Sequence, residues 1–241
     1  MRTLFRRSVL AVAVLGLLVG ASGKARAGTT IDTMPLWNGA NFISSFGVPE
    51  TATYGQSITV PVGPDTVLTD FTFQIDGFSA DPLTFKGYVF AWDGSKATGS
   101  ALFTSPTTTV ASGSGFNAVT FNTGGVQLTA GSQYVLFASV SETGGNPTQS
   151  GWGYLGTSVQ NGQDGYTGGN FVFENNGTDT SQWTSTVWNN PTFFGGHAAD
   201  DLAFTAHLNA PAPEPSTIIS GAIGIVMLSG YTWRRRRRAV V

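Results

Sequence analysis

The sequence predicts an all-β protein: a jelly-roll-like β-sandwich that follows a cleaved N-terminal signal helix and precedes a single C-terminal transmembrane helix. Short apolar alternations separated by turn-forming residues fill the middle of the chain, and no helical period is sustained between Gly28 and Ala210. Long apolar runs and clusters of basic residues occur only at the two ends. We therefore expect a signal peptide (1–27), a sandwich domain (28–210), a Pro-rich linker (211–217), a transmembrane helix (218–233) and a basic tail (234–241).

The first 27 residues have the order of a secretory signal peptide. A basic start is followed by an apolar run over residues 9–19. Ala25 and Ala27 supply the small side chains that signal peptidase accepts, so we expect cleavage that leaves Gly28 as the mature N-terminus. An uncleaved anchor is the alternative, but roughly 11 apolar residues are too few to cross about 30 Å of hydrocarbon.

The strands of the middle domain are expected in order along the chain. Clear alternation predicts strands at Phe71–Ile75, Tyr88–Trp92, Val119–Phe121, Tyr134–Val140 and Leu202–Leu208, and weaker patterns predict strands near Tyr54–Val60, Ala101–Val110, Gly151–Thr157, Asn170–Phe173 and Trp183–Trp188. The strand after Phe121 is expected to end at 122–125, where the sequence reads Asn-Thr-Gly-Gly. Roughly eight to eleven short strands with turn clusters between them favour a sandwich, and the long connections favour a jelly roll over an up-and-down barrel.

Charge and composition exclude several classes of function. Residues 28–210 contain two lysines, Lys86 and Lys96, against 13 acidic residues, which gives a formal charge of −11. A nucleic-acid binder needs a basic surface, so that class of partner is excluded. The chain has no cysteine, no Gly-x-Ser-x-Gly motif and no Glu-x-Asp-x-x-Glu motif. We therefore expect a protein that is not an enzyme.

The C-terminal segment has three parts in a fixed order. Pro213, Glu214, Pro215 and Ser216 precede an uncharged stretch that reaches Trp233. Five arginines follow it, namely Arg234, Arg235, Arg236, Arg237 and Arg238. The uncharged stretch is close to the roughly 20 residues that a spanning helix needs, and the arginines should stay on the cytoplasmic side. The two prolines keep the strip around Glu214 extended and outside the helix.

This order resembles the PEP-CTERM sorting signal of Gram-negative bacteria, a tail that is also labelled an ice-binding protein C-terminal domain. The resemblance covers residues 213–238. It implies export, a transient stay in the inner membrane, and processing near the Pro-Glu-Pro motif by an exosortase-type transpeptidase. It also implies delivery to the cell surface or extracellular matrix, in association with exopolysaccharide and biofilm. Residues 85–141 are similar to the body of many PEP-CTERM surface proteins, which implies no known site.

One short segment offers candidate metal ligands. Asp200 and Asp201 follow His197 and supply the hard oxygen ligands that Ca²⁺ prefers. The alternative is a polar turn that leads into the last strand. No Asp-x-Asp-x-Asp loop is present, so we expect no cofactor and keep structural calcium as the open alternative.

Large aromatic residues are concentrated in the glycine- and asparagine-rich segment 150–196. They are Trp152, Tyr154, Tyr166, Trp183 and Trp188. Aromatic rings on polar loops can stack on the apolar faces of sugars, which makes these residues candidates for a carbohydrate contact. The sequence favours the alternative, in which the rings belong to the core or cap the ends of the sandwich. Two functions therefore remain open: a structural surface or matrix protein, and a lectin-like module that binds sugar through these loop aromatics.

Overall fold

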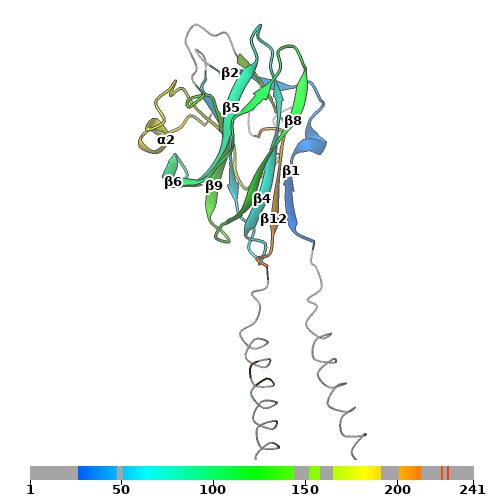
Figure 1. Ribbon diagram of the computed structural model, residues 1–241, viewed down its shortest axis with the longest axis vertical. Coiled ribbons are helices and arrows are strands. Elements are labelled where there is room, and N and C mark those ends of the chain that lie inside the picture. Colours follow the sequence, from blue (N-terminus) through cyan, green and yellow to red (C-terminus); the bar gives the residue numbers. More distant parts are fainter. Residues whose placement is uncertain are drawn as a thin grey trace, which may run out of the picture.

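The computed structural model describes residues 27–47, 51–143, 152–157, 165–190 and 201–212, together with Gly224 and Met227, which are helical. Within these residues the protein is all-β, with two antiparallel sheets, as the sandwich prediction requires (Figure 1). The predicted signal helix and basic tail lie outside them, as does the predicted transmembrane helix apart from Gly224 and Met227. Among the described residues, no helix is long and apolar enough to cross a bilayer.

The first sheet is built around β4. Its strands are β1 (Thr29–Asp32), β2 (Phe42–Gly47), β4 (Val67–Asp76), β8 (Phe116–Gln127), β10 (Trp152–Gly156) and β12 (Phe204–Asn209). One edge of β4 pairs with β8. The other edge pairs first with β12 and then with β10, and these two strands continue to β1 and β2 respectively. The short 3-10 helix η1 (Met34–Leu36) connects β1 to β2.

The second sheet has the order β11-β3-β9-β5-β6, with β7 also paired to β5. Its strands are β3 (Thr53–Thr59), β5 (Leu83–Trp92), β6 (Ala97–Thr104), β7 (Thr108–Val110), β9 (Gln133–Ser139) and β11 (Phe171–Glu174). The predicted strand at 101–110 is divided into β6 and β7, and Pro106 lies at the break because proline cannot donate to a ladder. A helix, α2 (Gln182–Ser185), follows β11.

The main core lies between the two sheets. Alternate residues of β4, including Phe71, Phe73 and Ile75, are fully buried there and meet Tyr54 and other apolar side chains of the second sheet. Gly87 permits a close approach: a Cβ at this position would lie 2.3 Å from the ring of Phe121.

Two sequence expectations need correction, and two strands were missed. The segment at 183–188 is not a strand, because α2 begins after a turn in which Asp179 Oδ1 accepts the Ser181 backbone N–H at 3.0 Å. β8 does not end at 122–125, because it continues to Gln127. Its register with β4 is irregular at this point, and Gly124 and Gly125 accommodate the irregularity with φ values of 72° and 98°. β1 and β2 were not predicted, since neither has a clear apolar alternation.

The two ends of the sandwich domain are neighbours. β1 is antiparallel to β12, and Thr29 lies opposite Leu208. The chain therefore enters and leaves the sandwich at the same end, as Figure 1 shows for β1 and β12.

Candidate functional site

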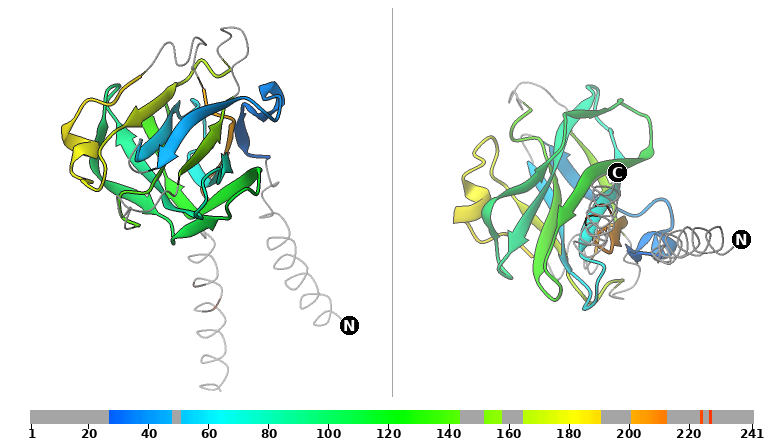
Figure 2. Two further views of the ribbon diagram at one scale, coloured as in Figure 1. Left: turned by 90° about the horizontal axis from the view of Figure 1, so that it is seen from above. Right: turned by 60° about the horizontal axis from the view of Figure 1, so that its bottom comes forward.

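The outer face of the second sheet is covered by the chain segment that contains α2. Figures 1 and 2 show α2 at the periphery of the molecule, outside this sheet. The buried residues of this second core are Tyr88, Phe90, Trp92, Ala97, Val135, Phe137, Val172, Trp183 and Trp188. Its centre is the Trp183 ring, whose centroid is 4.8 Å from that of Tyr88 and 5.0 Å from that of Phe137.

Two of the predicted sugar-binding aromatics belong to this core. Trp183 and Trp188 are only 4% and 3% exposed. Trp183 Nε1 donates to Thr53 Oγ1 at 3.1 Å, and Trp188 Nε1 donates to the Trp183 carbonyl at 2.9 Å. At these two positions the structure agrees with the core-or-cap alternative, because both rings and both donors are already used inside the protein.

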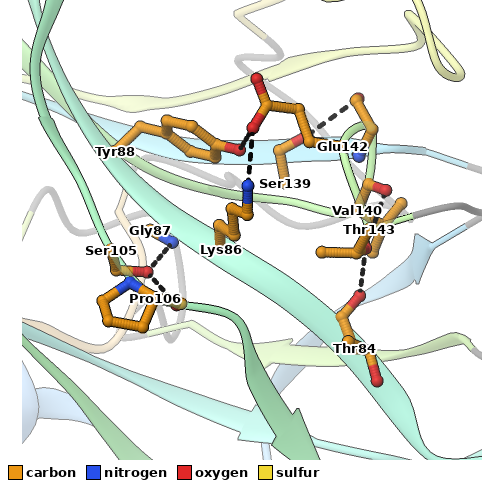
Figure 3. A network of polar contacts seen from close by, with 11 residues as sticks. Thr84, Lys86, Gly87, Tyr88, Ser105, Pro106, Ser139, Val140, Glu142 and Thr143 are labelled. Atoms are coloured by element: carbon orange, nitrogen blue, oxygen red, sulfur yellow. Dashed lines mark hydrogen bonds and ion pairs between the residues drawn. The ribbon is translucent and has the colours of Figure 1, made fainter.

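A polar network borders this second core (Figure 3). Lys86 Nζ lies 2.9 Å from Glu142 Oε2, and the Tyr88 hydroxyl donates to the same oxygen at 3.0 Å. The hydrogen bond from Lys86 lowers the pKa of Glu142. The pKa of Tyr88 is raised, mainly by burial and secondly by its hydrogen bond to Glu142. The network joins β5 to the chain after β9 through two hydrogen bonds to one carboxylate oxygen.

Asp201, one of the two candidate calcium ligands, is fully buried. Its Oδ1 accepts from Gln56 Nε2 at 2.6 Å, and its Oδ2 accepts from the Tyr166 backbone N–H at 2.7 Å. Asp200 and His197 lie outside the described residues. Within the described ranges, no group of three or more His, Cys, Asp or Glu residues could hold a metal ion. Asp201 therefore connects the chain just before the last strand to β3 and to the segment that begins at 165.

Tyr166, another predicted sugar-binding residue, also has a structural contact. Its hydroxyl donates to the Thr59 carbonyl at 2.9 Å, and its ring centroid lies 6.1 Å from that of Phe204 in the main core. The side chain is half-buried. Tyr166 thus attaches the segment before β11 to the end of β3.

The outer face of the first sheet has a row of aromatic side chains. We define the aromatic row as Phe78, Tyr154, Phe42, Phe116 and Trp37, in spatial order. Successive ring centroids are 4.8, 4.1, 6.4 and 5.1 Å apart. Phe42 and Phe78 are 46% and 56% exposed, so the row contains large apolar surface in contact with water.

Strand register places these rings together. Asp76 of β4 lies opposite Phe116 of β8 on one side and Tyr154 of β10 on the other. Side chains alternate along a strand, so the neighbouring Ile75 and Leu155 point into the core while Asp76 and Tyr154 point outward. Rings from three strands and two connections therefore meet on one face.

Trp37 reaches the row from the connection after η1. A Cβ at Gly156 would lie 3.1 Å from the indole ring, so the absence of a side chain there lets Trp37 lie close to the sheet. Its Nε1 donates to the Asn41 carbonyl at 2.7 Å. Asn38 Oδ1 accepts the backbone N–H groups of Ala40 and Asn41, which fixes the turn behind the indole.

Asp76 gives the row an acidic centre. Its Oδ1 is buried and has no hydrogen-bond partner among the described residues. Burial raises the pKa of Asp76, and burial together with the Asp76 charge raises the pKa of Tyr154. The site thus combines exposed aromatic surface with one half-buried carboxylate beside the rings.

Sequence reasoning identified only part of this arrangement. Tyr154 was predicted and lies in the row; Trp152 begins the same strand, and its side chain lies outside the described residues. Trp37, Phe42, Phe78 and Phe116 were missed, since they are separated by up to about 80 positions and only cross-strand pairing brings them together. The sorting residues 213–216 and 234–238 and the cleavage-site Ala25 lie outside the described residues, whereas Ala27 and Gly28 lie within them.

No protein-family model matches this chain, and no curated protein matches it.

Proposed function

We propose that this protein is an exported, non-enzymatic protein of the cell surface or extracellular matrix of a Gram-negative bacterium. The observation that supports the proposal is the order of the tail: the Pro213-Glu214-Pro215 motif, an uncharged apolar segment and five arginines. The fold is compatible with this route, since an acidic sandwich with two lysines between 28 and 210 has little attraction for nucleic acid.

The proposed route has three steps. Signal peptidase removes residues 1–27 during export, and the apolar tail then holds the chain briefly in the inner membrane with its arginines on the cytoplasmic side. An exosortase-type transpeptidase cuts near Glu214, which two prolines keep in an extended and accessible strip. The released domain reaches the surface or matrix and associates there with exopolysaccharide in a biofilm.

The sorting step is tested by substitution in the motif. Glu214→Gln, Pro213→Ala and Pro215→Ala should each leave full-length protein in the inner membrane fraction and reduce the released form, as measured by immunoblotting of cell fractions. Ala212→Ser, immediately before the motif, is the matched control and should be released normally. Normal release of all three motif variants would reject the sorting proposal.

A second candidate function is carbohydrate binding, and the aromatic row favours it. The sugar-binding surface proposed here differs from the predicted loop surface, because Trp183 and Trp188 are buried whereas Phe42 and Phe78 are exposed. Aromatic rings provide apolar contact area for sugar faces. No lysine or arginine lies in the row, so a neutral glycan suits it better than an anionic one.

Co-sedimentation with the organism's own exopolysaccharide tests this candidate. The wild-type protein should show saturable binding, and Phe42→Ala combined with Tyr154→Ala should weaken it at least tenfold. Leu102→Ala, which removes an exposed apolar side chain from the second sheet, is the control and should bind like the wild type. Binding that does not saturate, or equal binding by the Phe42→Ala/Tyr154→Ala variant, would reject the carbohydrate site and leave the structural function as the remaining candidate.

We also propose the jelly-roll type for the sandwich. Among the pairings of the described strands, only β5–β6 joins strands that are consecutive in the sequence. Such long-range pairing supports a jelly roll over an up-and-down arrangement.

A further inference from the structure

We propose that the carboxylate of Asp65 binds the α-ammonium group that signal-peptide removal creates at Gly28. This inference rests on the proposed export route, because it requires cleavage between Ala27 and Gly28. It adds a structural role for the new N-terminus: processing supplies a cationic partner for a buried carboxylate of the folded domain.

Asp65 is a buried carboxylate with one unused oxygen. The residue lies between β3 and β4 and is only 4% exposed. Its Oδ2 accepts a hydrogen bond from Thr29 Oγ1 at 2.7 Å. Its Oδ1 is buried without a hydrogen-bond partner among the described residues. Such an atom is costly in a folded protein unless a further donor reaches it.

Gly28 directly precedes the threonine that bonds this carboxylate, and it is held against β12. Thr29 pairs with Leu208, and the continued register brings Gly28 beside Asn209. A Cβ at position 28 would lie 2.1 Å from Asn209 Oδ1 and 2.3 Å from the Leu208 carbonyl oxygen, so the backbone of Gly28 lies directly against β12. Consecutive Cα atoms are about 3.8 Å apart, so the nitrogen of Gly28 lies within one residue of the threonine that bonds Asp65.

The lysines of the domain lie elsewhere, so the N-terminal amine is the cation that remains to pair with Asp65. Both lysines between residues 28 and 210 belong to the second sheet: Lys86 bonds Glu142, and Lys96 lies between β5 and β6. The other titratable side chains on the strands around Gly28 are Asp32 of β1, Asp70 and Asp76 of β4, and His207 of β12. His207 Nδ1 lies 2.6 Å from Asp70 Oδ1, so this pair is already formed.

Cleavage changes the chemistry of the Gly28 nitrogen. Signal peptidase adds water across the Ala27–Gly28 bond, Ala27 leaves with the new carboxylate, and the amine of Gly28 takes up a proton. A neutral amide with a single N–H becomes a cation with three donors, because a free α-amino group has a pKa of roughly 7.7–8.0. A charge-assisted hydrogen bond to Asp65 Oδ1 becomes available only in the processed chain.

The test measures the titration of this amine in the exported protein with its tail. Mass spectrometry first establishes the N-terminus. Reductive methylation with ¹³C-formaldehyde, which keeps each amine charged, then labels only Gly28, Lys86 and Lys96 for NMR titration. In the folded wild type the α-amine should titrate about one pH unit above the same amine in urea-unfolded protein.

Two variants separate the contact from the general acidity of the domain. Asp65→Asn should return the pKa of the α-amine to its unfolded value. Asp32→Asn, which removes an exposed carboxylate from β1, the strand that follows Gly28, should leave that pKa raised. Should Asp65→Asn not fold, equal titration of the folded and unfolded wild type would still refute the contact. Equal titration in those two states, or an unchanged value in folded Asp65→Asn, would overturn the inference. An N-terminus other than Gly28 would reject the proposed cleavage itself.

Discussion

Trp183 donates its indole hydrogen to Thr53 Oγ1 across 130 positions of sequence. Thr53 Oγ1 also lies 2.8 Å from Ser139 Oγ and donates to Asn176 Oδ1 at 2.8 Å. This buried polar centre connects the α2 segment to the start of β3 and the end of β9. The two sheets therefore differ: the outer face of one is sealed by its own chain, and the outer face of the other exposes aromatic rings.

Truncation of Trp183 should destabilise the domain without a selective effect on ligand binding. Trp183→Ala removes the centre of the second core and leaves Thr53 without its indole donor, so we expect a loss of about 3–5 kcal/mol in the free energy of unfolding. Denaturant unfolding measures this loss. Val187→Ala, at a 65% exposed position of the same segment, should stay within about 0.5 kcal/mol of the wild type.

Glu174 should reduce stability near neutral pH. It is buried, its Oε2 has no hydrogen-bond partner among the described residues, and burial raises its pKa. A raised carboxyl pKa means that folding is favoured while the group is protonated, and that this advantage disappears as pH rises through the folded-state pKa. Glu174→Gln should therefore stabilise the protein by about 1 kcal/mol at pH 7 and have little effect below pH ~4, in unfolding curves measured at both pH values.

Glu142 should show the opposite pH dependence. Its pKa is lowered, chiefly by the hydrogen bond from Lys86, so its contribution is present above the unfolded-state pKa and is lost as pH falls through the folded-state value. Glu142→Gln should lower stability at pH 7 and converge with the wild type in acid. The same sign of effect for Glu142→Gln and Glu174→Gln at pH 7 would contradict this account of the two carboxylates.

Gly87 should be required for the spacing of the sheets. A methyl group there would overlap the ring of Phe121, so Gly87→Ala should cost about 1–3 kcal/mol in thermal or denaturant unfolding. Combining Gly87→Ala with Phe121→Leu should relieve the overlap, because leucine is smaller than phenylalanine. The double variant should lose less stability than the sum of the two single variants, and strict additivity would show that the two residues do not interact.

Binding of exopolysaccharide through the aromatic row should be nearly independent of salt. The row consists of aromatic rings, and contacts of apolar rings are not screened by ions. Raising NaCl from about 0.05 to about 0.5 M should change the dissociation constant less than twofold. A steep loss of binding with salt would indicate that charged groups elsewhere on the domain make the contact.

Local sequence patterns predicted the all-β class and the best-defined strands. Phe71, Phe73 and Ile75 alternate with polar residues and are buried as expected, because a half-buried strand repeats every two residues. The same rule could not separate Trp183 from Tyr154. Both lie in a polar segment, and only the strands against which they pack determine that one is buried and the other lies on an outer face.

The aromatic row could not be predicted for a related reason. Phe42 and Tyr154 stack at 4.1 Å through a pairing between β2 and β10, which are more than 100 residues apart. The role of Asp201 was hidden in the same way, because its partner Gln56 lies 145 positions earlier in the chain. Non-local pairing of this kind leaves no periodic signal in a single sequence.

The antiparallel contact between β1 and β12 has a topological consequence. Because Thr29 lies opposite Leu208, a peptide bridge of a few residues could join the domain head to tail without disturbing a strand. Opening the ring at the exposed turn around Ser114 would give a circular permutant with every ladder intact. The architecture therefore does not depend on where the backbone starts. The permutant would, however, lack the proposed α-ammonium group of Gly28.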